Sequence, residues 1–178
     1  MERQNRVGGT MKRAKCDLCG RVMVTRKATA EQPYRDVMSG LENVFLVGIE
    51  VRECERCGAK VPIIPKVAAL HKAIARHLVF KSGLLTGKEV KFLRKNFGIQ
   101  AKEFAALIGV APAHLSRVEN GKTEAFSTAT DKLARAVAVA ASDGQIVKKL
   151  LLNTAGEKTD GRLNLFGLRK NQWEKLAA

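Results

Sequence analysis

The cysteines form two C-x-x-C-G motifs, and this arrangement constrains the fold of the N-terminal third more than any other feature. The two pairs are Cys16 with Cys19 and Cys54 with Cys57, and each pair is followed by glycine. Two residues between thiolates let one tight turn present both sulfur atoms to a single ion, and the glycine permits the positive φ angle that such a turn needs. Two turns of this kind complete a tetrahedral site with metal–sulfur distances of about 2.3 Å. We therefore expect this part of the chain to fold around one metal ion.

Zinc is the metal that this ligand set favours, as one structural Zn²⁺ per chain. A closed four-sulfur site leaves no position for water or substrate, so we expect it to be structural and not catalytic. A rubredoxin-like iron site uses similar motifs and is one alternative. A pair of disulfides is the other, and it is disfavoured because the basic start of the chain carries no apolar signal sequence, which predicts a cytoplasmic, reducing location. The metal is expected to supply much of the folding free energy of this module.

The residues between the two cysteine pairs read as β-strand. Residues 22–25 are a short apolar run, and residues 43–52 alternate apolar side chains on two faces before leading into Cys54. Pro33, Tyr34 and the pair Ser39-Gly40 are expected to mark loops between strands. A strand that leads directly into a cysteine pair is the layout of a zinc ribbon.

The hydrophobic period changes to that of a helix after Pro65. Four apolar residues at spacings of three and four form one stripe: Val67, Leu70, Ile74 and Leu78. His71 and His77 lie on the same predicted helix, and we expect them to pack or to face solvent because the four-sulfur site is already complete. Residues 80–83 are predicted to end the helix and to act as a linker.

Three short helices are predicted next, each ended by a glycine. They are residues 87–96 before Gly98, 99–108 before Gly109, and 112–120 before Gly121. Thr86 and Glu89 give the first helix a T-x-x-E capping box. Two short helices joined by a glycine turn have the geometry of a helix-turn-helix.

The third of these helices has two different faces. At about 100° per residue, Leu115 and Val118 point towards the core. The opposite face carries Ala113, Ser116, Arg117 and Asn120, with His114 on its flank. Arginine can fork onto guanine, while serine and asparagine can read bases or hold the backbone. Three further residues at helix or turn ends are placed where DNA phosphates would lie: Gln100, Lys102 and Lys122. The alternative is an ordinary three-helix packing unit with solvated polar residues.

These residues resemble the Cro/C1-type (XRE) helix-turn-helix family. The resemblance runs over residues 99–110 and 114–122, and the string L-S-R-x-E-x-G-K is its most diagnostic part. It implies that Glu119 forms a structural ion pair with Arg94 of the first helix. The chain departs from the family at Ala101, where members often carry a phosphate-binding glutamine, so that contact is expected to be displaced or lost. It departs again at Ala113, which is polar and reads a base in some relatives.

The cysteine ribbon followed by this helix-turn-helix is similar to the YgiT-type zinc-finger/helix-turn-helix family, over roughly residues 14–140. The resemblance implies a homodimer that binds a palindromic operator in double-stranded DNA, with two recognition helices about one helical turn apart. In antitoxin members of the family, the ribbon binds an mRNA-cleaving toxin. The expected function is therefore a DNA-binding transcriptional repressor, which in a toxin–antitoxin pair would regulate its own operon. The alternative is a toxin-neutralising interaction module for which DNA binding is secondary.

The charge of the chain agrees with a nucleic-acid partner. The 32 basic and 17 acidic residues give a net charge of +15, divided as +7 over residues 1–80, +5 over 81–140 and +3 over 141–178. A surface of this sign attracts phosphate polymers, although a solvated basic surface is the simpler explanation of the charge alone. Since no run of about 18 apolar residues is present, we expect no membrane span. No P-loop, G-x-S-x-G or H-E-x-x-H motif occurs, and no H-x-E precedes a cysteine pair, so we do not expect an enzyme.

Together these patterns predict a two-domain α+β chain. The N-terminal domain is a small β zinc ribbon and the C-terminal domain is an all-α helix-turn-helix bundle. The expected parts are a tail at 1–13, the ribbon at 14–64, a connecting helix and linker at 65–84, the helix-turn-helix domain at 85–152, and a linker and tail at 153–178.

Two C-terminal segments leave alternatives open. A helix is predicted over residues 129–141, with Leu133, Val137 and Ala140 on the side that forms either a dimer seam or part of the core. After a flexible linker at 153–162, the tail 163–176 carries Leu165, Phe166, Leu168 and Trp173 among basic residues. This tail can dock on a partner, on the ribbon, or on nothing.

Overall fold

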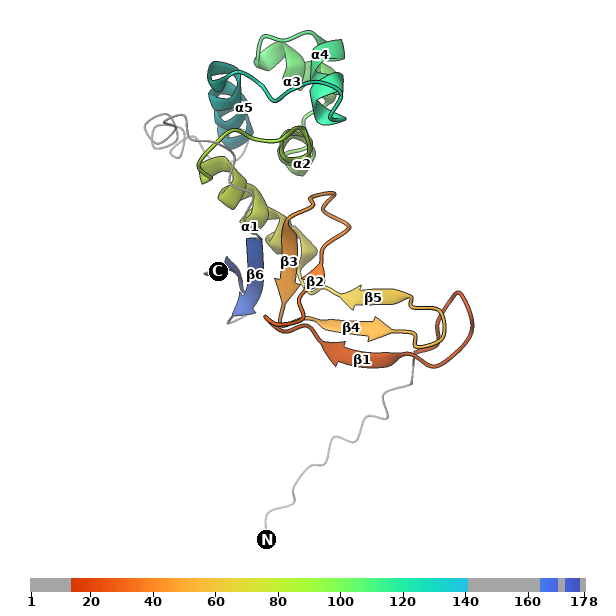
Figure 1. Ribbon diagram of the computed structural model, residues 1–178. Helices are drawn as coiled ribbons and strands as arrows, with labels where there is room; N and C mark the ends of the chain where they lie inside the picture. Colours follow the sequence, from red (N-terminus) through yellow and green to blue (C-terminus); the bar gives the residue numbers. More distant parts are fainter. Residues whose placement is uncertain (1–13, 141–163, 170–171, 177–178) are drawn as a thin grey trace.

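A computed structural model describes residues 14–140, 164–169 and 172–176 of the chain. The predicted N-terminal tail and the linker at 153–162 lie outside these residues. The described strands are β1 (Val24–Lys27), β2 (Tyr34–Arg35), β3 (Val44–Val47), β4 (Glu50–Glu53), β5 (Lys60–Ile63), β6 (Asn164–Arg169) and β7 (Gln172–Lys175). The helices are α1 (Val67–Phe80), α2 (Gly87–Asn96), α3 (Ala101–Leu107), α4 (Pro112–Glu119) and α5 (Thr128–Ala140). The strands gather at one end of the molecule and α2–α5 at the other, with α1 between them (Figure 1).

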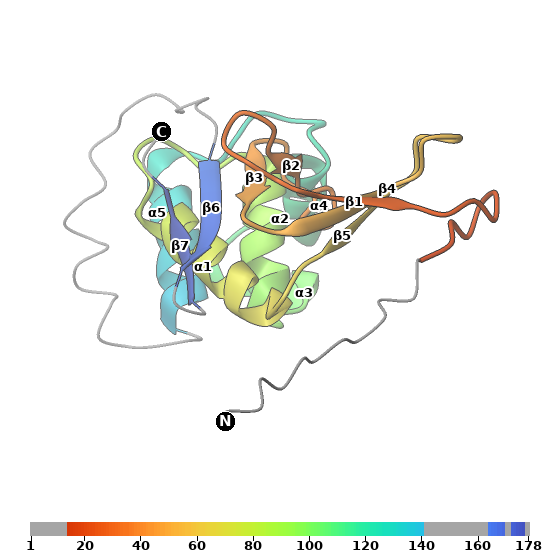
Figure 2. The same ribbon diagram turned by 90° about the horizontal axis from the view of Figure 1, so that it is seen from below.

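A three-stranded antiparallel sheet in the order β1-β4-β5 carries the two cysteine motifs. It projects from the rest of the molecule as an arm (Figure 2). The strand predicted at residues 22–25 is present as β1, shifted by two residues to Val24–Lys27. The sequence analysis missed β5, because Pro62 argues against a strand; it is tolerated here since β5 is an edge strand of the sheet.

The single strand expected over residues 43–52 is wrong, because Gly48 divides it. Its φ of +82° interrupts the extended backbone, so β3 and β4 run in two different sheets. The Gly48 N–H donates to the Ala28 carbonyl at 2.8 Å, and the Ala28 N–H donates to the Ile49 carbonyl at 2.9 Å. The chain therefore changes sheets at a hydrogen-bonded corner, and the alternation of buried residues resumes with Ile49 and Val51.

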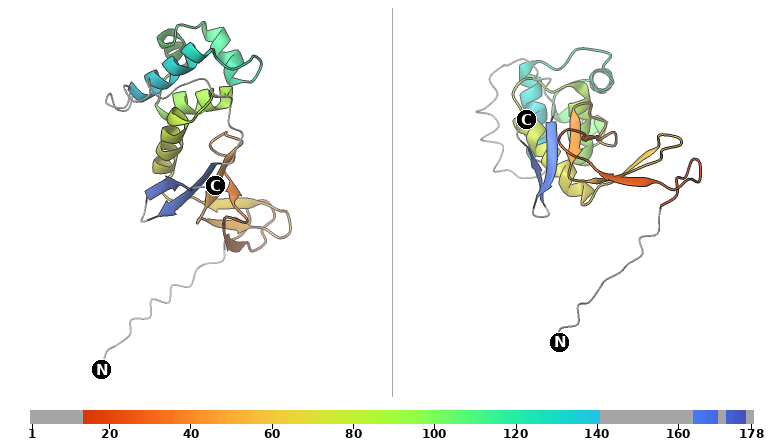
Figure 3. Two further views of the ribbon diagram at one scale, coloured as in Figure 1. Left: turned by 60° about the vertical axis from the view of Figure 1, so that its left-hand side comes forward. Right: turned by 60° about the horizontal axis from the view of Figure 1, so that its bottom comes forward.

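The second sheet has the order β2-β3-β6-β7 and includes the C-terminal tail. Tyr34 belongs to β2, so the loop expected at this residue is wrong, whereas Ser39 and Gly40 do lie in a turn. Strand β6 pairs in parallel with β3, and β7 returns antiparallel along β6. Of the three alternatives for the tail, the structure shows docking on the N-terminal module, beside α1 (Figure 3).

Helix α1 lies in a core that runs continuously from the strands to the helical bundle. Leu70, Ile74 and Leu78 of the predicted stripe are buried, but Val67 at its start is 38% exposed. The two histidines of α1 have packing roles, as expected. His71 meets the ring of Phe92 edge-on and His77 meets that of Phe166, and burial lowers the pKa of His77 to about 4.

The short connection between α1 and α2 is held by a buried arginine from α5, so it is not a free linker. Arg135 is 0% exposed and its Nε donates to Asp131 Oδ2 at 2.7 Å. Its other nitrogens donate to four backbone carbonyls at the end of α1 and in the connection, those of Leu78, Val79, Lys81 and Gly83. The second oxygen of Asp131 accepts the Leu85 N–H at 2.8 Å. The Arg135–Asp131 ion pair thus satisfies backbone groups at the end of α1 and in the connection that leads to α2.

The buried face of α5 is not the predicted one. It consists of Asp131, Ala134, Arg135, Ala138 and Val139. Of the side for which a dimer seam and the core were the alternatives, Leu133 is 42% exposed and Ala140 is exposed, whereas Val137 is half-buried against the core. The last residue of the predicted helix, 141, lies outside the described residues.

We expect Arg135→Met to destabilise the chain by about 3–5 kcal/mol, because it leaves the buried carboxylate of Asp131 and several carbonyls without their donor. Urea unfolding followed by circular dichroism measures the change. Arg76→Met, at an exposed position of α1, is the matched control and should change the free energy of unfolding by less than about 0.5 kcal/mol. Equal stability of the two variants would contradict the role given to Arg135.

Candidate nucleic-acid interface and metal centre

All three helices of the predicted motif are present, with α2 at its predicted bounds, α3 beginning two residues later and ending one earlier, and α4 ending one residue earlier. Thr86 Oγ1 accepts the Glu89 N–H at 3.3 Å and Glu89 Oε2 accepts the Thr86 N–H at 2.8 Å, which completes the capping box. Glu89 also receives Lys81 Nζ on both oxygens, at 2.9 Å each. The start of α2 is therefore tied to the connection that Arg135 holds.

All three helices end in a Schellman motif. At the turn of the helix-turn-helix, the Val110 N–H donates to the Ala105 carbonyl at 2.9 Å and the Gly109 N–H donates to the Ala106 carbonyl at 3.2 Å. Gly109 has a φ of +68°, which a side chain would strain. The same pair of bonds follows α2 and α4, so hydrogen bonds fix the angles at which the three helices meet.

Helix α4 lies against the first turn of α2 without room for an extra atom. A Cβ built on Gly87 would lie 1.8 Å from the Val118 carbonyl oxygen. Behind the same helix, Arg94 Nε and Nη2 donate to the two oxygens of Glu119 at 2.7 and 2.9 Å, and Arg94 Nη1 donates to the Ile99 carbonyl at 3.0 Å. The hydrogen bonds that Arg94 donates to the Glu119 carboxylate raise the pKa of Arg94. The structure thus contains the Arg94–Glu119 ion pair that the resemblance implied, and it holds α4 from its inner side.

The outward face of α4 has the composition expected of it. Leu115 and Val118 are buried, and the four residues predicted to face outwards are exposed: Ala113, Ser116, Arg117 and Asn120. Arg117 makes no side-chain hydrogen bond or ion pair with any residue in the described part of the chain. Its guanidinium is therefore available to a ligand.

Two of the predicted contact residues are already engaged within the domain. His114 is half-buried, and its ring lies 5.8 Å from that of Phe126. The Asn120 amide donates to the Ser116 carbonyl at 2.8 Å, and its oxygen accepts Lys91 Nζ at 3.2 Å. A hydrogen bond from Asn120 to a base would require these internal bonds to break first, whereas Arg117 has no bond of this kind to break within the described residues.

The three predicted phosphate-contacting residues surround this face. Gln100 is the N-cap of α3, Lys102 lies in its first turn, and Lys122 lies in the turn after α4; all three are exposed. The Lys122 N–H donates to the Arg117 carbonyl at 2.8 Å, so the position of Lys122 is coupled to the end of the recognition helix. The sequence analysis did not single out three further basic residues beside α4, namely Lys88, Lys91 and Lys95 of α2, which line one pocket with Glu119 and Asn120. Their spacing of three and four residues, which places them on one face of a helix, was the signal that could have found them.

The four cysteines come together at the tip of the three-stranded sheet. Their Sγ atoms all lie within 4.8 Å of one another, and the contacts between the two motifs are 3.5 Å for Cys16 with Cys57 and 3.4 Å for Cys19 with Cys54. Metal–sulfur bonds of about 2.3 Å require tetrahedral sulfurs about 3.8 Å apart. All four thiols are free in this structure, and the positions of their sulfur atoms are compatible with one metal ion bound by all four.

The two motifs have the same backbone. In the first, the Gly20 N–H donates to the Cys16 carbonyl and the Cys16 N–H to the Arg21 carbonyl, at 2.8 and 2.7 Å. In the second, the Gly58 N–H donates to the Cys54 carbonyl and the Cys54 N–H to the Ala59 carbonyl, at 2.8 and 2.9 Å. Both glycines have positive φ, as the spacing predicted.

The thiols differ in acidity because of their hydrogen bonds. The backbone N–H of Cys57, and then the thiol of Cys19, lower the pKa of Cys54 to about 6. The backbone N–H of Arg21 acts to lower the pKa of Cys19, but hydrogen bonding with the other thiols and burial outweigh it and raise the pKa to about 12. A bound cation would favour the ionised form of the thiols through its own charge.

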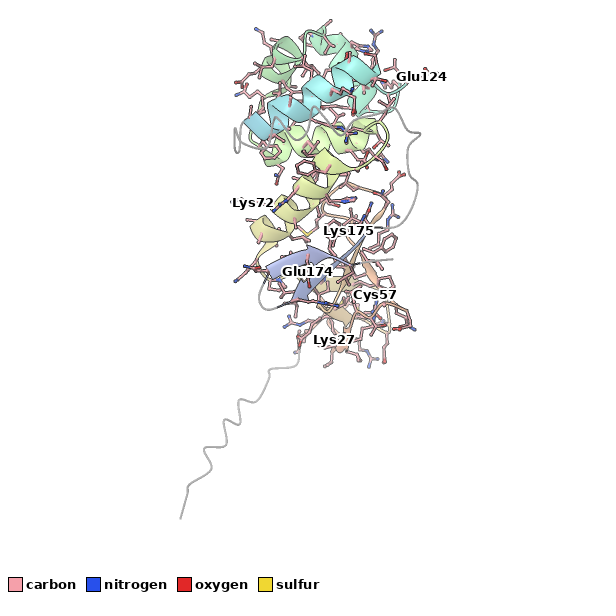
Figure 4. All side chains as sticks on the ribbon, turned by 90° about the vertical axis from the view of Figure 1, so that its left-hand side faces the viewer. Lys27, Cys57, Lys72, Glu124, Glu174 and Lys175 are labelled. Carbon is pink, nitrogen blue, oxygen red and sulfur yellow. The ribbon has the colours of Figure 1, made fainter. Side chains whose placement is uncertain are left out.

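The metal centre and the recognition helix lie at opposite ends of the molecule. Cys57 is near one end and Glu124, shortly after α4, is near the other (Figure 4). Cys16, Met23 and Cys54 form a small cluster separate from the main core. A metal ion held there would order the tip of the sheet and would not touch the outward face of α4.

We expect the purified chain to hold about one zinc ion by elemental analysis, and Cys54→Ser to release it. Because the cysteine cluster is separate from the main core, the variant should lose amide protection at residues 14–24 and 54–60 in hydrogen exchange while the helices stay protected. Glu55→Ser, between the two cysteines of the same motif, is the control that should keep its zinc. A metal-free chain with a fully protected tip would contradict the assignment.

Comparison with known proteins identifies the helical module. A protein-family model described as Helix-turn-helix matches residues 90–137, which extend from α2 into α5. Searches of curated proteins and of solved structures gave no significant match. Among the described residues, no helix has the length and apolar character needed to cross a membrane. The chain therefore carries an XRE-type helix-turn-helix domain, a kind of domain that binds double-stranded DNA, together with a β-sheet module that ends in a four-cysteine cluster.

Proposed function

We propose that this protein is a sequence-specific transcriptional repressor that binds a palindromic operator as a homodimer. The observation that supports it best is the outward face of α4. Arg117 is exposed there with no partner among the described residues, on a helix that the Arg94–Glu119 pair and the close contact at Gly87 hold from behind. A rigid helix with a free guanidinium in its outer face suits reading in the major groove.

Each exposed group has a distinct part in the proposed complex. Arg117 donates two hydrogen bonds to the O6 and N7 atoms of a guanine, which specifies sequence. Ser116 reads an adjacent base or holds the backbone. Lys122 and Gln100 contact phosphates on either side, which positions the helix without reading sequence. The excess positive charge of the chain adds affinity for any DNA.

The metal centre is proposed to be a structural Zn²⁺ site. Cys16, Cys19, Cys54 and Cys57 would supply all four ligands, so no position remains for a substrate and no catalytic role is proposed. The ion would hold the tip of the sheet in its folded form. A cytoplasmic location is part of the same proposal, since the thiols must stay reduced.

The exposed side of α5 is the proposed dimer contact. Leu133 and Ala140 are exposed, and Ala136 and Val137 between them at helical spacing are half-buried against the core, so the outer edge of this side is open to a partner. An apolar stripe of this kind is suited to packing against its copy across a two-fold axis. The resemblance to the YgiT-type family independently implies a homodimer.

A second candidate function is neutralisation of a toxin by the sheet module. The resemblance to the YgiT-type family, which includes the MqsA antitoxin, supports it. So does one face of the sheet β1-β4-β5, where Thr25, Lys27, Val61 and Ile63 are exposed beside Arg52. Co-purification of a second chain encoded beside this one, lost when zinc is chelated, would favour this function.

We expect Arg117→Ala to weaken binding to the operator by about 1–3 kcal/mol and to reduce the preference for operator over random DNA. Lys122→Ala should instead weaken binding to both DNAs alike and make log K less steeply dependent on log salt, by about one unit of slope. Fluorescence anisotropy with operator and random duplexes, over a range of salt, measures both effects. Arg76→Ala, on α1, is the control; an operator preference unchanged by Arg117→Ala would refute the assignment.

We expect Leu133→Glu to dissociate the proposed dimer, because it places a charge in the apolar stripe. Light scattering after size exclusion should report the mass of one chain for this variant and of two chains for the parent. Thr128→Glu, exposed at the start of the same helix, should remain dimeric. A parent protein that is monomeric at micromolar concentration would rule out the homodimer.

A further inference from the structure

A cationic pocket of about 500 Å³ lies beside the recognition helix, between α2 and the turn that precedes β3. Its walls include Lys88, Lys91 and Lys95 from one face of α2, the side chains of Phe92 and His71, and Met38 from the turn. This volume is within the range of small-molecule sites. The DNA-reading function proposed above makes no use of this pocket.

The charge of the pocket is strongly biased. Glu119 is the only carboxylate in its lining, and both of its oxygens are bound by Arg94. Lys95 forms no ion pair with any residue that the structure describes. Lys88 pairs with Glu42 at the exposed rim. Lys91 and Lys95 are therefore the cationic groups of the pocket that no described carboxylate neutralises, and they are suited to an anion.

The opposite wall is apolar and held in place. Met38 is 72% exposed, and it lies in a turn that has its own hydrogen bonds. Asp36 Oδ1 accepts the Met38 N–H at 3.2 Å, while Ser39 Oγ donates to the Asp36 carbonyl at 2.9 Å and accepts the Leu41 N–H at 3.3 Å. Across the pocket, the rings of His71 and Phe92 meet edge-on at 5.6 Å. A thioether and an aromatic pair are suited to a flat apolar group.

We infer that this pocket binds a small organic anion with an aromatic or similar apolar part, and that its occupancy weakens DNA binding. The link is Lys91, whose ammonium donates to Asn120 Oδ1 at the end of α4. A ligand anion that takes this ammonium withdraws it from Asn120 and neutralises positive charge beside the recognition helix. The electrostatic attraction between this end of α4 and the phosphates of the DNA backbone then falls.

Phenyl phosphate is the probe for binding, because it combines a dianion with one ring. In a titration of the full chain followed by ¹H–¹⁵N NMR, we expect saturable shifts of the amides of Met38, Lys91, Lys95 and Asn120. The double variant K91Q/K95Q should raise the Kd at least about tenfold, as loss of charge-assisted bonds requires. The matched pair K27Q/K72Q removes two exposed lysines outside the pocket (labelled in Figure 4) and should leave the Kd within about twofold.

Three outcomes of the titration would overturn the binding proposal. One is an equal effect of the two double variants. Another is that inorganic phosphate binds as tightly as phenyl phosphate and Met38→Ser binds phenyl phosphate as tightly as the parent. That result would show that the pocket does not recognise the apolar part of the ligand. The third is the absence of any phenyl phosphate site while K91Q/K95Q weakens binding to all DNA, which would assign these lysines to the DNA backbone.

The coupling rests on the proposed function and is tested separately. At constant ionic strength, saturating phenyl phosphate should lower operator affinity at least about fivefold, the lower end of common allosteric couplings. Met38→Ser, which changes no charge, should abolish this effect, and sulfate at the same concentration should not reproduce it. If phenyl phosphate binds and operator affinity is unchanged, the coupling is wrong; if the chain binds no DNA, the proposed function fails while the ligand site remains.

Discussion

The arrangement of the two modules depends on the buried ion pair of Arg135 with Asp131. Taking both charges out of water is costly, and the cost is offset only if nearly every donor and acceptor of the pair is used. Here the guanidinium satisfies carbonyls at the end of α1 and in the connection, and Asp131 accepts the N–H of Leu85. These are backbone groups that the end of one helix and a connecting segment leave without partners. The pair therefore fixes the path between α1 and α2, and with it the placement of the helix-turn-helix on the sheet module.

The C-terminal hairpin strengthens the same connection from the other side. Strand β6 adds to β3, and Trp173 of β7 donates its indole N–H to the Pro65 carbonyl, just before α1 begins. Helix α1 is consequently held at its start by the hairpin and at its end by Arg135. Since one hydrophobic core runs through both modules, a change at the sheet can reach the bundle through packed side chains. The cysteine cluster is the exception, because it lies at the tip of the sheet with a small core of its own.

Local signals predicted the helical module closely, and non-local pairing explains most of what they missed. The capping box at Thr86, the glycine after each helix and the four-cysteine spacing depend on residues a few positions apart, so the sequence contains them directly. The same is true of the outward face of α4, which follows from helical periodicity. The break at Gly48 and the pairing of β6 with β3 depend instead on residues far away in the chain, such as Ala28 in the first case. The inner face of α5 was missed for a related reason: it is buried around an arginine and an aspartate, which hydrophobic periodicity places in solvent.

The outer face of α4 is divided between groups that are free and groups that the domain itself uses. Arg117 forms no side-chain hydrogen bond or ion pair with the residues that the structure describes, while Glu119 on the inner side is bound by Arg94. Asn120, in contrast, is already bonded within the domain. Its amide donates to the Ser116 carbonyl at the end of the helix, and its oxygen accepts a hydrogen bond from Lys91. A side chain of this kind contributes to DNA affinity only by the difference between its internal bonds and those it would make with a base. Lys91 is the α2 lysine bonded to Asn120, so under the proposed coupling the end of α4 is where a ligand in the pocket would act on DNA binding.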